Sequence, residues 1–223
     1  LKEAEQKLAE QRQRLSDLAK QSADFRELIS RSEAEIPAAG RAAQDAKAAD
    51  AAQAKNARTA SMPFGDPARL SPKIAFADAK GLLPVPVSGK IVKTYGAPDG
   101  IGGAEKGLSL ATRPGAPVAS PSDGWVAFSG PYRTYGQLLI INAGGGYYVV
   151  LAGMERINVE VGQFVLAGEP VATMGDGTAR TALATAVPLG ASQPILYVEF
   201  RKDGTAIDPG PWWAKAELEK VRG

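Results

Sequence analysis

Two different sequence patterns divide this chain at about residue 83. Before that point the apolar residues follow helical spacings, and after it short runs rich in β-branched and aromatic residues alternate with Gly and Pro turns. Runs of this length and spacing predict a mainly β domain, built as an antiparallel sandwich or barrel. The expected strands are residues 89–95, 106–111, 117–119, 124–128, 137–142, 147–151, 164–166, 170–174 and 195–200.

Residues 1–36 carry the heptad spacing of a coiled coil. Apolar residues recur every seven positions on one register, and a companion register runs beside it. Polar residues interrupt the seam at Gln11 and Ser22. The pattern therefore predicts a helical arm, which is either the end of a longer coiled coil or a helix that docks elsewhere. The first register holds Leu1, Leu8, Leu15, Ile29 and Ile36, and the second holds Ala4, Leu18 and Phe25.

Residues 37–73 are rich in Ala and end in a Pro-rich stretch that stops any helix. Ala favours helix but buries little area, so this segment cannot build a core of its own. Two interpretations stay open. The segment is either a solvated helix or flexible linker, or a regulatory helix that packs on the β domain in one state and leaves it in another. The β domain then spans residues 74–223, with short helices expected at residues 74–80 and 212–221.

The chain of 223 residues contains no His and no Cys. It therefore offers neither imidazole nor thiolate to a metal ion, and it forms no disulfide. The 26 Lys and Arg against 24 Asp and Glu leave a net charge of +2, without the basic runs typical of nucleic-acid binding. No stretch approaches the about 18 apolar residues of a membrane-spanning helix. Because the sequence starts at Leu1 inside a helical pattern, it is interpreted as a fragment that lacks any signal peptide.

Several short motifs follow one another in a fixed order through the β-rich part. Each is common by itself, and the ordered set is the specific signal. Together the motifs resemble the LytM, or lysostaphin-like, metallopeptidase domain over residues 84–213. The resemblance implies an antiparallel β fold with a groove at the zinc site. The motifs are Val85–Gly96, Lys106–Leu110, Gly115–Val118, Ser122–Val126, Tyr135–Gly136 and Val161–Gly168.

Active members of that family hold zinc with a His and an Asp four residues apart and with the second His of a His-x-His pair. A further His assists the attacking water. The resemblance places the ligands and the pair on Glu105, Ser109, Ile195 and Tyr197, and the assisting His on Gly153. One carboxylate at Glu105 would leave the ion mostly hydrated. The replacements therefore imply a domain that binds no zinc, needs no cofactor and is not an enzyme.

In its departures from the active family, the chain resembles the EnvC-type murein hydrolase activators. Residues 76–87 before the domain, residues 208–212 after it and the N-terminal coiled coil carry this resemblance. It implies an envelope factor of cell division in the periplasm of a Gram-negative bacterium. The degenerate groove of such a protein binds and switches on N-acetylmuramoyl-L-alanine amidases, and the coiled coil links it to a membrane division complex.

A groove without metal ligands presents apolar and aromatic side chains next to a few polar groups, which suits an amphipathic helix or loop from a partner. Tyr and Arg are the side chains that most often dominate binding at interfaces. The alternative for Tyr197 is a core position, and for Lys106 and Arg201 a solvated charge. Glu199 is expected to be structural. The predicted partner-binding residues are Lys106, Ser109, Tyr135, Leu138, Leu151, Gly153, Ile195, Tyr197 and Arg201.

The leading hypothesis is a non-catalytic activator, whose groove captures an amidase segment that blocks the amidase's own zinc site. The alternative, from another class, is a peptidoglycan-binding targeting module that activates no amidase. An active hydrolase with an unusual site is the third hypothesis, and the missing ligands argue against it. A helix from residues 26–60 that lies in the groove would make the protein autoinhibited.

Overall fold

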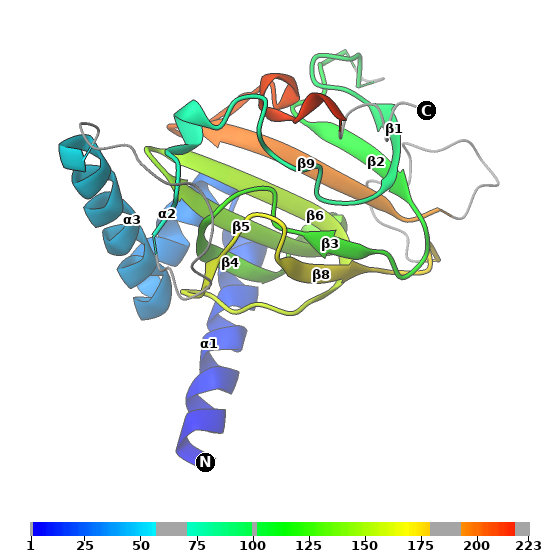
Figure 1. Cartoon of the computed structure of the whole chain (residues 1–223). Helices are drawn as coiled ribbons and strands as arrows, with labels where there is room; N and C mark the ends of the chain where they lie inside the picture. Colours follow the sequence, from blue (N-terminus) through cyan, green and yellow to red (C-terminus); the bar gives the residue numbers. More distant parts are fainter. Residues whose placement is uncertain (1, 57–70, 100–101, 179–192, 217–223) are drawn as a thin grey trace.

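Within residues 2–56, three helices precede the β domain and lie against it (Figure 1). Residues 2–56, which contain all three, are called the helical arm below. The computed structural model describes residues 2–56, 71–99, 102–178 and 193–216. The helices are α1 (Lys2–Gln21), α2 (Phe25–Glu35) and α3 (Pro37–Asn56).

Helices α1 and α2 meet at a sharp turn that starts at Ser22. The amide and the hydroxyl of Ser22 both donate to the carbonyl of Leu18, at 2.9 and 2.7 Å, and close the last turn of α1. The Asp24 carboxylate then accepts the amide of Glu27 at 2.8 Å and caps α2. The single heptad seam predicted over residues 1–36 is therefore interrupted at its polar position, because Ser22 and Asp24 both satisfy helix ends.

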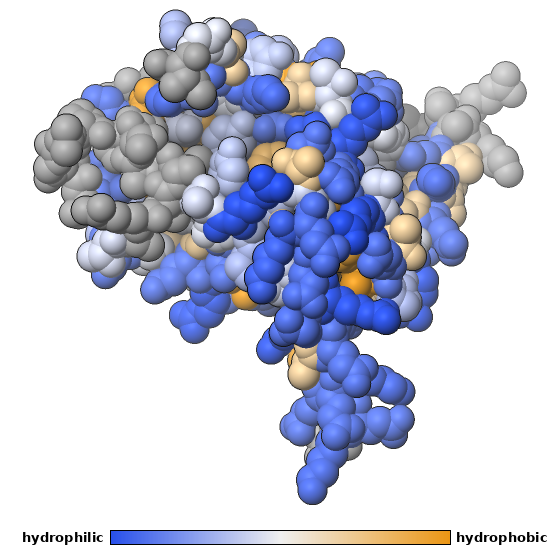
Figure 2. Space-filling view, turned by 180° about the vertical axis from the view of Figure 1, so that it is seen from behind, coloured by the Kyte–Doolittle hydropathy of each residue, from blue (hydrophilic) through white to orange (hydrophobic). Residues whose placement is uncertain are grey.

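The apolar side of the arm packs on the β domain from the middle of α1 onward. Residues 2–7 are exposed and project away from the domain (Figure 1), and Figure 2 shows this end of α1 as almost wholly hydrophilic. The Ala-rich segment forms α3, whose Ala42 and Ala46 pack against Trp125. The seam residues Leu15, Leu18, Phe25, Ile29 and Ile36 are each 8% exposed or less.

The strands form an antiparallel sheet in the order β1-β2-β9-β6-β5-β4-β7, with β10 beside β9 and β8 paired with both β3 and β6. All nine strands expected from the sequence are present, and β10 is an additional one. The prediction of a mainly β, antiparallel domain behind a helical arm is confirmed. The strands are β1 (Gly89–Lys93), β2 (Leu108–Thr112), β3 (Pro117–Ala119), β4 (Gly124–Pro131), β5 (Gln137–Gly144), β6 (Tyr147–Ile157), β7 (Phe164–Val165), β8 (Pro170–Met174), β9 (Ile195–Lys202) and β10 (Thr205–Ile207).

The two faces of the sheet bury two separate clusters, because side chains alternate along a strand. In β9, Leu196, Val198 and Phe200 belong to an inner core between the sheet, the β3–β8 pair and the flanking segments. Ile195 and Tyr197 belong to a second cluster together with buried residues of α1 and α2. The face that carries this second cluster is called the arm-side face.

The segments before β1 and after β10 close the inner core at one end. A short 3-10 turn, η1 (Phe76–Asp78), occurs where the sequence predicts a helix over residues 74–80. Trp212 follows in the turn η4 (Gly210–Trp212), and its indole nitrogen donates to the Phe76 carbonyl at 2.9 Å. The two rings lie 5.6 Å apart between centroids. The ends of the β domain are therefore fastened to each other.

Two sequence predictions fall largely outside the described residues. These are the Pro-rich break near residues 61–67 and most of the terminal helix expected over residues 212–221. Within the described ranges, no helix combines the length and the apolar character needed to cross a membrane.

Candidate functional site

Four neighbouring strands each place one side chain in a row across the arm-side face. Ser109 of β2 lies opposite Tyr197 of β9, Tyr197 lies opposite Ala152 of β6, and Ala152 lies opposite Leu138 of β5. Opposite residues of antiparallel strands point to the same face, so these side chains are neighbours. All four are buried. They are called the central row below, and they form the middle of the candidate site.

Tyr197 is the largest side chain of the central row and is held from two sides. Its hydroxyl donates to the Glu199 carboxylate at 2.6 Å. A Cβ added at Gly107 would lie 2.8 Å from Cζ of the Tyr197 ring, so the ring rests directly on this glycine. Burial, followed by the negative charge of Glu199, raises the pKa of Tyr197. The phenol therefore stays protonated and serves as a hydrogen-bond donor.

Glu199 and Arg201 continue along β9 on the same face. The Arg201 guanidinium donates to Glu199 and, at 2.5 Å, to the carbonyl of Gly204. Glu199 is only 2% exposed, so Arg201 supplies the counter-charge that such a buried carboxylate requires. Nε of Arg201 is buried and has no hydrogen-bond partner among the described residues. Arg201 is thus fixed in an ion pair and keeps one unused donor.

Glu105 and Lys106 lie at the edge of the site, just before β2. The Glu105 carboxylate pairs with Nζ of Lys93 at 2.5 Å and is half-buried, whereas Lys106 is exposed. Within the described part of the chain, no group of three or more Asp, Glu, His or Cys side chains is arranged to hold a metal ion. The carboxylates of the site are instead occupied by Lys93, Tyr197 and Arg201.

Two predicted site residues occupy other places than expected. Leu151 lies opposite Val198 and belongs to the inner core, so its assignment to the groove is wrong. It is adjacent in sequence to Ala152 of the central row, and adjacent strand residues point to opposite faces. Gly153 follows at a point where the β5–β6 register shifts, and its φ of 98° requires glycine. It contributes backbone next to the row. Ile195 lies two residues from Tyr197 along β9, opposite Ala111.

An aromatic chain connects the arm to the central row. The Phe25 ring of α2 lies 5.3 Å from Tyr132 and 5.6 Å from Tyr135, measured between centroids. Tyr135 in turn lies 6.4 Å from Tyr197. Burial raises the pKa of Tyr135, and the charges of nearby carboxylates raise it further. The first residue of α2 therefore sits on the rings that lead to the middle of the site.

Two polar contacts of α2 add to this packing. The Ser32 hydroxyl donates to the carbonyl of Ala127 in β4 at 2.7 Å. The Tyr148 hydroxyl of β6 donates to the Glu33 carboxylate, also at 2.7 Å. Leu28, between Phe25 and these anchors, is fully buried in the same cluster as Leu138 and Tyr197. Helix α2 thus lies on the face that the sequence assigns to a partner.

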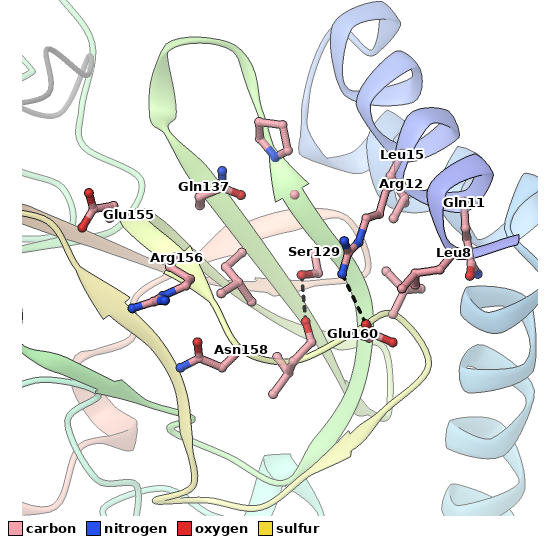
Figure 3. A pocket seen from close by; sticks show the side chains of 15 residues that line it. Leu8, Gln11, Arg12, Leu15, Ser129, Gln137, Glu155, Arg156, Asn158 and Glu160 are labelled. Atoms are coloured by element: carbon pink, nitrogen blue, oxygen red, sulfur yellow. Dashed lines mark hydrogen bonds and ion pairs between the residues drawn. The ribbon is translucent and has the colours of Figure 1, made fainter. Parts of the chain in front are cut away.

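A separate pocket of about 410 Å³ lies between α1 and the ends of β4, β5 and β6 (Figure 3). Arg12 of α1 reaches across it to Glu160, with 3.6 Å between nitrogen and oxygen. Leu8 forms part of the helical wall, and Gln137 and Asn158 lie on the sheet side (Figure 3). None of the site residues predicted from the sequence lines this pocket.

The central row lies in the part of the chain that matches a known protein family. The sequence model of Peptidase family M23 matches residues 103–209. This part of the chain is a peptidase family M23 domain. The fold agrees with a solved structure of the SpoIIQ–SpoIIIAH pore-forming complex, with a TM-score of 0.50 and 18% identity over 66% of this chain and 100% of that one.

Two relatives of similar sequence carry names of activators. The murein hydrolase activator NlpD of Escherichia coli (strain K12) is 31% identical over 56% of this chain and 29% of its own length. The murein hydrolase activator EnvC of the same strain is 28% identical over 93% of this chain and 48% of its own length. The chain therefore spans less than half the length of these relatives, and the similarity to EnvC includes the helical arm.

Several residues of the M23 domain's arm-side face were missed from the sequence. Tyr132, Tyr148 and Ala152 carry no motif, and their roles come from packing against α2 and the central row. The sequence offers one signal for two of them, since the alternation of a strand puts Tyr148 and Ala152 on the same face of β6. That this face is also the face of Tyr197 follows only from the register of β6 with β9.

Proposed function

We propose that this chain is a non-catalytic activator of a peptidoglycan amidase, an N-acetylmuramoyl-L-alanine amidase, in the splitting of the cell wall during division. The activator names of its relatives support this proposal. The observation that carries it is the chemistry of the central row, where Tyr197 is bound to Glu199 and its neighbours are Ser, Ala and Leu. On this proposal, residues without a metal or acid–base role stand where active members of the family have metal ligands and catalytic groups, namely Glu105, Ser109, Gly153, Ile195 and Tyr197.

We propose that the amidase binds to the arm-side face. Tyr135, Leu138, Ile195 and Tyr197 give this face an apolar and aromatic floor. The unused donor of Arg201 favours an acceptor from a partner. The face already accommodates one amphipathic helix, namely α2, which supports a helical segment as the partner's binding element. Exposed Lys106 stands at the rim, where it changes association more than final affinity.

We also propose that the helical arm autoinhibits the protein. While α2 lies on the arm-side face, a partner helix cannot occupy the same surface. Activation then requires the arm to leave, and the amidase binds the released face with the segment that blocks its own zinc site. Arm and partner compete for one surface, so the balance depends on the difference between their binding free energies.

We also propose where the protein is located in the cell. The exposed end of α1 is the continuation of a coiled coil, which links the protein to a membrane division complex in the periplasm of a Gram-negative bacterium. The heptad pattern and the likeness to EnvC over the helical arm support this link and this location. Leu8, half-buried on an otherwise exposed part of α1, occupies a seam position that a second helix would cover.

The second candidate function is a peptidoglycan-binding module. The pocket beside α1 favours it, because Gln11, Gln137 and Asn158 offer amide groups next to the charged Arg12 and Arg156, which suits a glycan or short peptide. Sedimentation of the full chain with purified sacculi, in the absence of any amidase, separates the two functions. Substantial co-sedimentation would favour the binding module.

Release of dye from labelled sacculi tests the activator function. A panel of purified zinc N-acetylmuramoyl-L-alanine amidases from Gram-negative bacteria is assayed with and without the full chain. We expect the chain alone to release nothing and to accelerate at least one amidase, more strongly when the arm is loosened by substitution. Dye release by the chain alone, with added Zn²⁺, would refute the proposal.

A further inference from the structure

One side chain of the β domain holds the turn between α1 and α2. The guanidinium of Arg133, the first residue of the turn η2 (Arg133–Tyr135), donates a hydrogen bond to the carbonyl oxygen of Ser22. This oxygen follows the last turn of α1, where helix carbonyls lack intrahelical partners and carry partial negative charge. A fixed cation is the strongest donor for that position.

The backbone of Arg133 is itself unusual. Its φ of 47° lies in the left-handed region, which is unfavourable for a residue with a Cβ. The side chain has two contacts that offset this cost, the bond to Ser22 and a position over the Tyr132 ring at 5.5 Å from its centroid. A glycine would fit the backbone better and would lose both contacts. The side chain is therefore the reason for an arginine here.

The same loop also holds the first residue of α2. Phe25, three residues after Ser22, lies against both Tyr132 and Tyr135, which flank Arg133. The loop thus binds the end of α1 through Arg133 and the start of α2 through its two tyrosine rings. Motion at one of these contacts moves the other, because only Ala23 and Asp24 separate them.

Helix α1 has few other attachments that would hold it. Its exposed end carries no buried side chain before Leu15. The Arg12–Glu160 ion pair joins side chains that are 70% and 61% exposed, and such pairs contribute little. Leu15, Leu18 and Ala19 are buried directly before the turn. A displacement of the exposed end of α1 therefore acts on the turn at Ser22.

We propose that Arg133 is the latch of the helical arm. Its bond to Ser22 keeps Phe25 on the tyrosine rings, and a load on the exposed end of α1 opens the arm by breaking this bond first. The consequence for an amidase rests on the proposed function, whereas the opening of the arm does not.

Distance measurement between two spin labels tests the latch on the full chain. Spin labels attach to Cys side chains, and the chain contains none. A variant with Glu10→Cys in α1 and Lys90→Cys in β1 therefore carries two labels at known positions. Both positions are exposed. We expect one dominant, narrow distance in the parent protein, with a small open population at longer distance. Arg133→Ala should raise this open fraction about tenfold, the effect of losing one charge-assisted hydrogen bond.

Two further variants separate the latch from a purely structural turn. Arg133→Gly also removes the side chain but relieves the positive φ, so a latch predicts opening and a merely strained turn predicts a more stable, closed protein. Arg113→Ala removes an exposed arginine elsewhere and should leave the distance unchanged. Parent-like distances in both Arg133 variants would overturn the proposal. Opening of the arm without any gain in amidase activation would leave the latch standing and count against the proposed function.

Discussion

The hydroxyl of Tyr148 in β6 donates a hydrogen bond of 2.7 Å to the carboxylate of Glu33 in α2. Burial raises the pKa of Glu33, and the bond from Tyr148 and the charge of Lys47 offset this only in part. Burial also raises the pKa of Tyr148, so the phenol remains the donor. The docked arm therefore contains a carboxylate whose charged form is disfavoured by its surroundings.

This carboxylate predicts that docking of the arm weakens as the pH rises. A raised pKa stabilises the docked state fully below the ordinary value of 4.5, and this contribution is lost as the pH rises through the docked-state pKa. Glu33→Gln keeps a side-chain oxygen for Tyr148 and removes the titration. Spin-label distances from about pH 4 to pH 8 should show opening of the parent arm and a flatter curve for the variant. Parallel curves would contradict the assignment to Glu33.

Replacement of Phe25 by Ala should open the arm and increase amidase activation. Phe25 is 8% exposed and touches both Tyr132 and Tyr135, so its loss removes a buried aromatic side chain, worth about 3 kcal/mol or more, from the arm contact. Dye release from labelled sacculi measures the effect, and Ser30→Ala, at an exposed position of the same helix, is the control. Activation equal to that of the parent would argue against autoinhibition by α2.

Gly107→Ala should destabilise the β domain by about 1–3 kcal/mol, the cost of overpacking a filled core. The added Cβ would lie 2.4 Å from the Val198 carbonyl oxygen and 2.8 Å from the Tyr197 ring. Gly130→Ala is the matched control, since its added Cβ meets nothing closer than 3.7 Å. Urea unfolding of both variants gives the comparison. Equal midpoints would mean that Tyr197 is not fixed on Gly107.

Tyr197→Ala and Arg201→Ala should each weaken amidase binding by about 1–3 kcal/mol, the usual range for an interface anchor. Tyr197→Phe keeps the ring on Gly107 and loses only the bond to Glu199, so it should retain most of the affinity. Arg201→Ala also strips Glu199 of its counter-charge, and circular dichroism must first show that the variant is folded. Unchanged pull-down and activation by both alanine variants would exclude this face as the binding site.

Residues 147–152 of β6 could not be assigned to the two faces of the sheet from the sequence. This run is apolar throughout, because both faces of β6 are buried, and an all-apolar run does not reveal which of its two alternating sets of side chains lies on the arm-side face. Leu151 was placed on the wrong face for this reason. The register with β9 decides the matter, since it sets Ala152 opposite Tyr197 and Leu151 opposite Val198.

The sequence by itself determined the strands, the helical character of the arm up to residue 36 and the lack of imidazole and thiolate ligands, because these depend on local spacing and composition. Only the tertiary structure decided what the apolar side of the arm covers. Leu15, Phe25 and Ile29 fit a coiled-coil partner and a sheet equally well, since an apolar helix face requires burial without specifying its neighbour. The break at Ser22 and the tyrosine rings beside Arg133 direct that face onto the central row.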